Sequence, residues 1–429
     1  MAYPAGDQHR PRGLVGHVAG VLTAGTAGPA TRIMLERAAG LRGRRLAVAV
    51  RDRVARRGGP RMRALTAYPG GRFVWRDVPE PAPPGPDAAV VHPIAVATCD
   101  LDRAMGLGRT PFPLPMHFGH ECVAEVLSVG ERVSTVRPGD RVVVPFQISC
   151  GTCAPCRSGR TANCASVPPA SMYGFGVAGG HWGGVLSDQV AVPYADAMLV
   201  PLPSGVAPSS AASVADNVSD GYRSVAPYVP AMLVRDPDAS VLILSELGRR
   251  PPLSSSVVLY AGLVAKALGV REVHFVDRRR HVRDQAESLG LSAHATVRGL
   301  PPAPLVLDGT CMSAGPRLGL LHTAPDGMCV SPGGLTRTAR IPIAMMYGRN
   351  ATYHLSRAHA RTVIPQVLAL MSEGRLRPNW SPRTWLAWTT PRPRSARTSS
   401  VSRRKRSSWN SYQDEHTRLA GYVRHHGGS

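Results

Sequence analysis

Four cysteines that lie within fifteen residues are the clearest chemical signal in this sequence. They are Cys150, Cys153, Cys156 and Cys164, with two, two and seven residues between neighbours. The short gaps allow successive thiolates to approach one ion, and the longer gap returns the loop for the fourth. Four soft sulfur ligands without an open position are typical of a closed tetrahedral zinc site that holds a loop. The alternatives are a chance cluster or two disulfides, which cytosolic proteins rarely use.

A second group of metal-binding residue types is spread over more of the chain. Cys99 lies 21 residues before His120, and Asp216 lies 96 residues after it. His120 stands in the sequence Gly119-His120-Glu121, directly before a predicted strand. A single Cys or His usually has a structural role, so each residue alone is a weak signal. Their combination with the cysteine cluster gives the group its meaning.

Together, the two groups resemble the zinc-dependent alcohol dehydrogenases of the medium-chain dehydrogenase/reductase family. The resemblance runs from about Met62 to about Trp380 and includes the turn at residues 138–141 and the pair Gly183-Gly184. It implies an α/β fold, with a GroES-like β-barrel catalytic domain and a Rossmann cofactor domain built on a doubly wound parallel sheet. It also implies two zinc ions per chain, a nicotinamide cofactor, and a homo-oligomer, either a dimer or a tetramer.

The resemblance carries over to individual positions. Cys99 and His120 match two ligands of a catalytic zinc. Asp216 resembles the third ligand in the variety with Asp at this place, which includes secondary-alcohol and glutathione-independent formaldehyde dehydrogenases. Glu121 matches a residue that neighbours the ligands or exchanges with them. The structural zinc would be bound by Cys150, Cys153, Cys156 and Cys164.

This ligand set implies a reaction. Three protein ligands leave a fourth position for the oxygen of a small alcohol or aldehyde. Zinc there acts as a Lewis acid that lowers the pKa of a bound hydroxyl, and hydride passes to the nicotinamide. Family members usually place Ser or Thr two residues after the Cys ligand, to relay the proton, whereas this chain has Leu101 there. Asp100 or Asp102 could substitute through water, and the relay stays unassigned.

The first turn of the cofactor domain departs from the family pattern. A Rossmann turn needs glycines so that the backbone can approach the pyrophosphate at a helix N-terminus. After the predicted strand Ser240–Leu244, only Gly248 remains of three glycines. Ser254–Ser256 could supply hydroxyl and backbone donors, and Arg249 or Arg250 could pair with phosphate. The alternative interpretation is a plain surface loop in a degenerate site.

The next strand matches the family better. Glu272–Val276 is followed by Asp277, the acid that usually accepts hydrogen bonds from the adenosine ribose and favours NAD. Arg278 and the two arginines after it could instead hold the 2′-phosphate of NADP. We expect NAD, with Gly248, Asp277 and Arg278 as the cofactor-binding residues.

The pattern of apolar residues and of Pro and Gly turns predicts the elements that position these residues. Short strands with Pro and Gly turns suggest an antiparallel barrel-like domain up to about Pro203. Its predicted strands include Asp87–Val96, Glu121–Val129, Asp140–Val144 and Leu186–Val192. From about Pro208, helices and strands alternate, which predicts a parallel sheet. The alternating elements are Ser240–Leu244, the helix Ser256–Leu268, Glu272–Val276, the helix Val282–Leu289 and Pro304–Leu307.

The predicted domain order follows from these patterns. It comprises an Arg-rich extension (1–61) outside the fold, the catalytic domain (62–215) with the zinc loop (150–164), the Rossmann domain (216–350), a partial return to the catalytic domain (351–380) and an Arg/Ser-rich disordered tail (381–429). We expect Met62 to be the functional start. Read two bases out of phase in GC-rich codons, Ala387–Pro391 becomes Leu-Asp-Asp-Ala-Pro, which resembles the family ending. We therefore expect a frameshift near residues 380–386.

The net charge of +23 at first suggests nucleic-acid binding. However, residues 1–61 carry +9 and residues 381–429 carry +8, which leaves only +6 for the folded part. We therefore expect no specific nucleic-acid partner. No run approaches 18 apolar residues, so we expect no membrane span, and the cysteine usage favours a cytoplasmic location.

Three functional hypotheses remain open at this stage. The first is a zinc-dependent, NAD(P)-linked alcohol dehydrogenase. The second is a catalytically impaired pseudoenzyme of the same fold, which would explain the missing glycines and the missing relay residue. The third is nucleic-acid binding through the arginine-rich ends, which predicts salt-sensitive binding without sequence preference.

Overall fold

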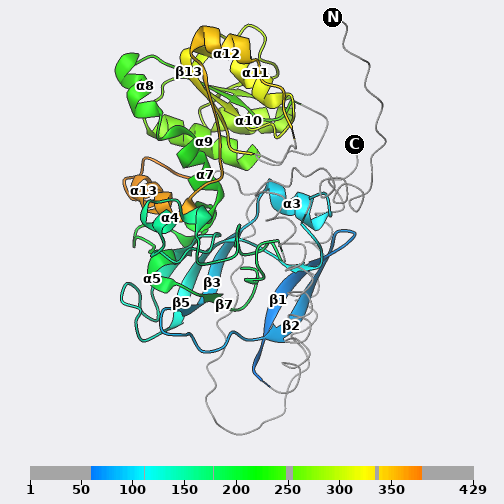
Figure 1. Cartoon of the computed structure of the whole chain (residues 1–429), viewed down its shortest axis with the longest axis vertical. Coiled ribbons are helices and arrows are strands. Elements are labelled where there is room, and N and C mark those ends of the chain that lie inside the picture. Colours follow the sequence, from blue (N-terminus) through cyan, green and yellow to red (C-terminus); the bar gives the residue numbers. More distant parts are fainter. Residues whose placement is uncertain (1–58, 111, 177, 248–254, 334–337, 379–429) are drawn as a thin grey trace, which may run out of the picture. The chain divides into compact units, whose positions relative to one another are not determined.

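The computed structural model describes residues 59–110, 112–176, 178–247, 255–333 and 338–378 (Figure 1). Three of the sequence predictions lie outside these ranges. They concern the extension before residue 59, the cofactor-loop glycine Gly248, and the tail from residue 379 with its frameshift. Within the described ranges, no helix is both long and apolar enough to cross a bilayer.

Antiparallel strands build the first part of the described chain, coloured blue to green in Figure 1. A three-stranded sheet has the order β2-β1-β4, and a five-stranded sheet has the order β7-β3-β5-β6-β8. The strands are β1 (Arg61–Tyr68), β2 (Arg72–Pro79), β3 (Ala89–Ala97), β4 (Met116–His117), β5 (Glu121–Val129), β6 (Arg141–Val144), β7 (Val190–Val192) and β8 (Val200–Pro201).

Strand β5 shows why this part is buried on two sides. Its side chains alternate between two apolar clusters, as the period of a strand requires. Cys122 and Ala124 pack with Val144 in the interior of the antiparallel part. Val123 faces the other way and packs with Ala215 in the second cluster. The strand that carries His120 and Glu121 at its start is therefore held from both faces.

The predicted antiparallel strands are confirmed, with one shortened. The strand expected at Leu186–Val192 begins only at Val190. Leu186 instead accepts a backbone hydrogen bond from Leu65 and donates one to Phe118, so it belongs to the other sheet. The chain crosses between the sheets here, which a period of apolar residues does not reveal.

The second part is a six-stranded parallel sheet with the order β11-β10-β9-β12-β13-β14. Counted from β9, this is the order 3-2-1-4-5-6 of a Rossmann fold, so that prediction is confirmed. The strands are β9 (Val241–Leu244), β10 (Val273–Val276), β11 (Ser292–His294), β12 (Ala303–Asp308), β13 (Thr323–Ser331) and β14 (Thr352–Leu355). The helices that connect them are α9 (Ser255–Ala267), α10 (Arg280–Ser288), α11 (Gly315–Leu321) and α12 (Ile343–Arg349).

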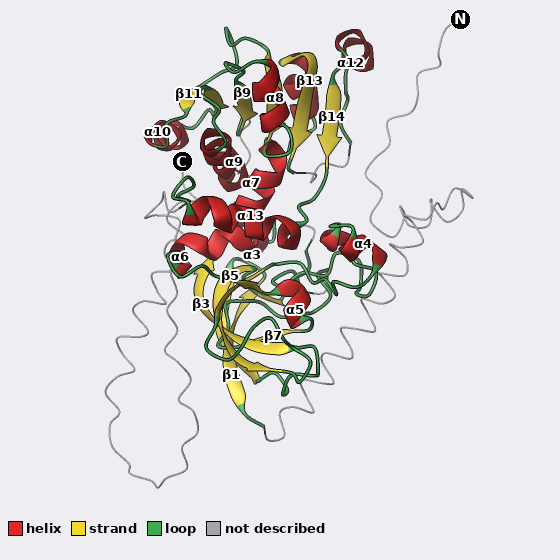
Figure 2. Cartoon of the chain, turned by 90° about the vertical axis from the view of Figure 1, so that its left-hand side faces the viewer, coloured by secondary structure: helices red, strands yellow, loops and turns green. Residues whose placement is uncertain are grey.

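The parallel sheet separates two apolar layers, and helices flank its strands (Figure 2). Val241 and Ile243 of β9 face a layer that contains Val258 of α9. Leu242 and Leu244 face the opposite layer, with residues of α11. Both faces of β9 are thus covered, which explains its uninterrupted apolar sequence.

Along the chain, the remaining described helices lie within the first part, between the two parts, or after the parallel sheet. They are α3 (Asp100–Gly106), α4 (Ala154–Arg157), η2 (Thr161–Asn163), α5 (Ala195–Met198), α6 (Pro208–Ala211), η3 (Ala212–Ala215), α7 (Asn217–Val225), α8 (Val229–Arg235) and α13 (Ala360–Ser372). Helix α7 packs closely on α9 at Gly221, because a Cβ there would lie 2.8 Å from the backbone nitrogen of Ala261. This close approach determines where the residue before α7, Asp216, is placed.

The chain after β14 returns to the first part of the structure. Gln147 donates a hydrogen bond to the carbonyl of Ala358 and accepts one from the Ala360 N–H. Thr362 donates to the carbonyl of Gly159, within the cysteine-rich loop. The start of α13 is therefore attached to the same loop that the four cysteines shape.

Candidate metal centres and nucleotide site

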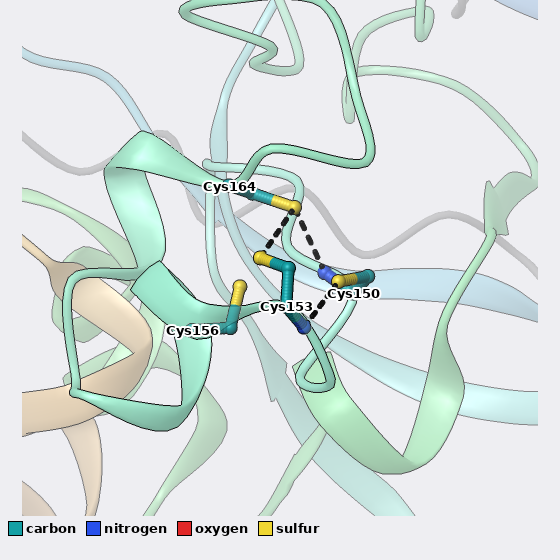
Figure 3. Close-up of side chains that lie close together, drawn as sticks. All are labelled: Cys150, Cys153, Cys156 and Cys164. Atoms are coloured by element: carbon teal, nitrogen blue, oxygen red, sulfur yellow. Dashed lines mark hydrogen bonds between the residues drawn. The ribbon is translucent and has the colours of Figure 1, made fainter.

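The four clustered cysteines converge in space as their spacing predicts (Figure 3). All four Sγ atoms lie within 4.8 Å of one another, and Cys153 Sγ lies 3.9 Å from Cys164 Sγ. A tetrahedron with zinc–sulfur bonds of about 2.3 Å has sulfur–sulfur edges of about 3.8 Å. All eight cysteines of the chain have free thiols in the structure, so the disulfide interpretation gains no support. The cluster fits a structural zinc.

Local backbone geometry supports thiolates at this position. Cys153 N–H donates to Cys150 Sγ, Cys150 N–H donates to Cys164 Sγ, and Ala165 N–H donates to Cys153 Sγ. Burial raises the pKa of Cys150, but hydrogen bonds from Ser166, Thr152 and backbone amides outweigh it and lower the value to about 5. Burial and the neighbouring Cys153 raise the pKa of Cys156 to about 12. A divalent cation would supply the charge that lets all four sulfurs ionise together.

Contacts from the returning chain hold the loop on its outer side. His359 Nδ1 accepts a hydrogen bond from the Ala162 N–H at 3.1 Å. Arg357 donates to the carbonyl of Ala162 and to the side-chain oxygen of Asn163. The cysteine loop therefore connects the barrel to the segment that follows the parallel sheet.

The second group of possible ligands comes from three separate elements. Cys99 precedes α3, His120 directly precedes β5, and Asp216 lies between η3 and α7. Gly119 has φ +90, and a Cβ there would lie 2.9 Å from the Leu186 backbone nitrogen. A glycine is required here, because other residues rarely adopt this conformation and would not fit. This turn directs His120 inward, and its ring is fully buried.

His120 is the residue that the other candidates surround. Its Nε2 lies 3.6 Å from Cys99 Sγ, 3.4 Å from Asp216 Oδ2 and 3.7 Å from Glu121 Oε1. A tetrahedral zinc site has nitrogen–sulfur edges of about 3.5 Å and nitrogen–oxygen edges of about 3.4 Å, from its usual bond lengths. Cys99 and Asp216 thus each approach His120 Nε2 at a spacing that suits such a site. The groups whose ligand atoms all lie within 4.8 Å of one another are Cys99, Asp102 and His120, and His120, Glu121 and Asp216, which share His120.

Asp102 is a further member of this site. Its Oδ2 accepts a hydrogen bond from the Cys99 backbone N–H at 2.9 Å, and its Oδ1 lies 3.3 Å from His120 Nδ1. A carboxylate at this nitrogen orients the imidazole and leaves Nε2 free for a metal. The sequence analysis considered Asp102 only as a possible proton relay. The position of Asp102 three residues after Cys99 gave no signal for this contact, because the contact depends on how separate elements pack.

Glu121 is completely buried, and only one of its two carboxylate oxygens has a hydrogen-bond partner among the described residues. Asn217 Nδ2 donates a hydrogen bond to Glu121 Oε1 at 2.6 Å, while Oε2 has no hydrogen-bond partner among the described residues. Burial raises the pKa of Glu121 well above its usual range. Burial likewise raises the pKa of Cys99 to about 12. Buried acids of this kind are costly when charged, and a bound cation relieves that cost. The donor set and its orphaned oxygen therefore fit a divalent metal.

The two carboxylates considered as proton relays are both engaged in other contacts. Asp102 contacts Cys99 and His120, as described above. Asp100 Oδ2 accepts hydrogen bonds from the Ser256 N–H at 2.7 Å and from its Oγ at 3.0 Å. Leu101 stands where a Ser or Thr relay is usual, so the structure provides no relay at that position.

At the carboxyl end of β10, Asp277 is fully buried and bound by Arg279. Its Oδ1 accepts from the N–H and Nε of Arg279, and its Oδ2 accepts from Nη2 at 2.6 Å. Arg279 Nη2 also donates to Ser255 Oγ at the start of α9. The neighbouring Arg278 points its Nη1 to the carbonyl of Leu247 instead. Arg279, not Arg278, is thus the cation at this site, a distinction that the run of arginines did not reveal.

Comparisons with known proteins agree with this geometry. Residues 85–204 match the family model of the alcohol dehydrogenase GroES-like domain. A probable zinc-binding alcohol dehydrogenase of Mycobacterium tuberculosis is 28% identical over 73% of this chain and 79% of its own length. A glutathione-independent formaldehyde dehydrogenase of Bacillus subtilis is 39% identical, but only over 27% of this chain and 28% of its own length. Among solved structures, an alcohol dehydrogenase from Thermus sp. ATN1 has a TM-score of 0.63 and 28% identity, covering 74% of this chain and 90% of its own.

These similarities support a zinc-dependent medium-chain dehydrogenase family for this chain, and its fold combines a GroES-like domain with a Rossmann sheet. It is an oxidoreductase of the alcohol dehydrogenase type. The family resemblance that we noted from the four-cysteine cluster and from the group of Cys99, His120 and Asp216 is therefore confirmed.

Proposed function

We propose that this protein is a zinc-dependent, NAD(P)-linked alcohol dehydrogenase that interconverts a small alcohol and its aldehyde or ketone. The carrying observation is the convergence of Cys99 Sγ and Asp216 Oδ2 on His120 Nε2, at 3.6 and 3.4 Å. These atoms come from three segments that are far apart in sequence and that the fold brings together around His120. The site lies in a chain that also contains a Rossmann sheet.

The residues of the site have distinct roles in this proposal. Cys99, His120 and Asp216 hold a zinc ion that, when bound, polarises the substrate oxygen as a Lewis acid. In this proposal Asp102, whose Oδ1 lies 3.3 Å from His120 Nδ1, orients the ring when the metal is bound. Glu121 neighbours the ligands, and Asn217 holds its Oε1 at 2.6 Å. The second zinc ion, at Cys150, Cys153, Cys156 and Cys164, stabilises the loop.

The Rossmann domain is proposed to bind the dinucleotide that accepts or supplies hydride. Ligands of open parallel sheets bind at the carboxyl ends of the strands, where the strand order reverses. In this sheet that point lies between β9 and β12. Asp277 follows β10 and has one acceptor position left on Oδ2, since Arg279 uses the other three. We propose NAD as the preferred dinucleotide, as the acid at this position favours.

The proposal is tested by zinc analysis together with turnover on a panel of alcohols and aldehydes. About two zinc ions per chain and formation of NADH or NADPH with one of the substrates would support it. Asp216→Ala should retain about one zinc and the fold but lose turnover. Full activity of Asp216→Ala would show that the third ligand is assigned wrongly.

A catalytically impaired member of the family is the second candidate. Three observations favour it: the lost glycines after β9, Leu101 at the usual relay position, and Asp100 bound at the start of α9. Such a protein would keep the structural zinc and show no turnover with any tested alcohol and dinucleotide. The same turnover panel therefore separates the two candidates.

We also propose that the protein forms a homo-oligomer and works in the cytoplasm. β14 lies at one edge of the parallel sheet, and Ile343, Tyr347 and Leu355 near it expose 64, 86 and 51% of their surface. Exposed apolar residues beside a sheet edge are suited to a second copy of the chain. A dimer or tetramer in light scattering that dissociates in Tyr347→Lys supports this, and a monomeric parent chain contradicts it.

A further inference from the structure

The carboxylate of Asp100 occupies the beginning of helix α9. Its Oδ2 accepts one hydrogen bond from the backbone N–H of Ser256, at 2.7 Å, and another from the Ser256 hydroxyl, at 3.0 Å. Asp100 belongs to α3, and 156 residues separate it from Ser256. Both residues are partly buried, so the contact joins the barrel part to the parallel-sheet part at a sheltered position.

The end of α9 at which Asp100 lies is suited to a phosphate. α9 has 13 residues and follows β9, the strand that starts the 3-2-1-4-5-6 order. The first N–H groups of a helix have no partner within the helix, and its dipole favours an anion there. In the Rossmann arrangement, the dinucleotide pyrophosphate uses this helix end. A pyrophosphate bound by the Ser256 N–H would therefore have to replace Asp100 there.

The surroundings of Asp100 are also those of a bound anion. Arg279 donates to Ser255 Oγ at 2.7 Å, next to Ser256. Burial raises the pKa of Asp100, and the Ser256 hydrogen bonds and the charge of Arg279 oppose that rise. Arg279 is in turn held by Asp277 through both carboxylate oxygens. At this end of the sheet, Asp100, Ser255, Asp277 and Arg279 are thus engaged in contacts within the protein. A bound dinucleotide would have to replace some of these contacts.

We propose that Asp100 is an internal occupant of the phosphate-binding end of α9, which a dinucleotide must displace in order to bind. This inference rests on the proposed function, because it concerns the binding of that same cofactor. Since Asp100 directly follows Cys99, its displacement moves the backbone beside a predicted zinc ligand. Dinucleotide binding is thereby coupled to the catalytic metal site. The parent chain binds its cofactor more weakly than a chain without the Asp100 carboxylate would.

The test measures dinucleotide affinity in the full, zinc-loaded chain with Asp100→Asn, which keeps the shape and removes the charge. Binding of NADH and NADPH is followed by calorimetry and by nicotinamide fluorescence, independently of turnover. We expect the dissociation constant to fall about tenfold, because a contact that leaves about one molecule in ten competent weakens apparent binding by that factor. Inorganic pyrophosphate alone should show the same direction of change.

Asp238→Asn is the matched control, because Asp238 is an exposed carboxylate shortly before β9, paired with Arg271 and away from the start of α9. It should leave the dissociation constant unchanged, which excludes a general effect of net charge. Asp100→Ala removes the acceptor completely and serves as the second variant if Asp100→Asn folds poorly.

The possible results separate the two proposals. Equal affinity in the parent chain and both Asp100 variants, or weaker binding by the variants, overturns the inference and leaves the dehydrogenase proposal intact. Absence of binding of either dinucleotide to the parent chain and to every variant overturns the dehydrogenase proposal and the inference with it. Tighter binding confined to the Asp100 variants supports both.

Discussion

His120 Nε2 lies 3.4 Å from Asp216 Oδ2, although 96 residues separate the two in sequence. The contact depends on two different parts of the fold. Gly119 turns His120 into the barrel interior, and the packing of α7 on α9 places Asp216 opposite it. The predictions below test this relationship and the contacts that support it.

Replacing Asp216 with alanine should remove one of two zinc ions and lower kcat/KM by more than about 100-fold, while the melting temperature stays close to that of the parent. Asp216 is a proposed direct zinc ligand, so its loss lowers the affinity for the metal, whereas the apolar core is unaffected. Zinc content, steady-state kinetics and thermal unfolding measure the three quantities. Asp284→Ala, which removes an exposed carboxylate from α10, should change none of them.

Cys153→Ser should release the other zinc ion and destabilise the fold by on the order of 4 kcal/mol or more, since a lost metal is among the severe changes. Cys153 Sγ is one of four sulfurs within 4.8 Å of one another. Metal analysis and denaturant unfolding test this. The control is Cys311→Ser, which replaces a half-buried thiol outside both ligand groups. A full zinc complement in Cys153→Ser would contradict the assignment.

Gly221→Ala should destabilise the protein by about 2 kcal/mol and lower activity at the same time. The added Cβ would lie 2.8 Å from Ala261 N and 2.9 Å from the Val257 carbonyl oxygen, so α7 must move away from α9. Asp216 immediately precedes α7 and moves with it. Gly205→Ala is the control, because no atom lies within 4 Å of its Cβ position. If Gly221→Ala loses stability but keeps full activity, Asp216 is positioned by something other than α7.

The protein should lose stability on mild acidification, in part through His359. Burial and the charges of Arg357, Arg223 and Arg160 lower the pKa of His359 below its ordinary value of 6.5. The folded chain therefore binds this proton less readily than the unfolded chain. The contribution of neutral His359 to the free energy of unfolding is fully present above about pH 6.5. It is lost as the pH falls from there toward the pKa that His359 has in the folded chain.

The accompanying measurement compares melting temperatures at about pH 7.5 and about pH 5.5. His359→Gln keeps an acceptor for the Ala162 N–H but does not titrate, so its melting temperature should fall less than that of the parent. His281→Gln, at an exposed position of α10, should behave like the parent. An equal fall in all three proteins would show that His359 does not contribute.

Asp277→Ser should weaken NAD binding more than NADP binding, by about tenfold in the ratio of the two dissociation constants. The change removes the acceptor for the ribose hydroxyls and frees Arg279, which Asp277 holds at 2.6 Å, to pair with a 2′-phosphate. Calorimetric titration with both dinucleotides measures the ratio. Equal use of NAD and NADP by the parent chain would already argue against the preference.

Most of the fold was predictable because it depends on local patterns. The helix expected at Ser256–Leu268 is observed at Ser255–Ala267, and the strand expected at Ser240–Leu244 is observed at Val241–Leu244. Apolar periodicity and turn residues determine such elements within a few neighbouring positions. The strand expected from Leu186 is the exception, since its first residues pair with the other sheet.

The convergence of the four cysteines could be predicted from the sequence, because gaps of two residues leave a short loop little choice of geometry. It also indicated Cys99, His120, Glu121 and Asp216 through their family spacing. Three contacts could not be predicted in this way: Asp102 lies beside His120, Arg279 rather than Arg278 binds Asp277, and Asp100 lies at the start of α9. These contacts join residues whose distance depends on how whole elements pack, and neither residue type nor local spacing encodes that packing.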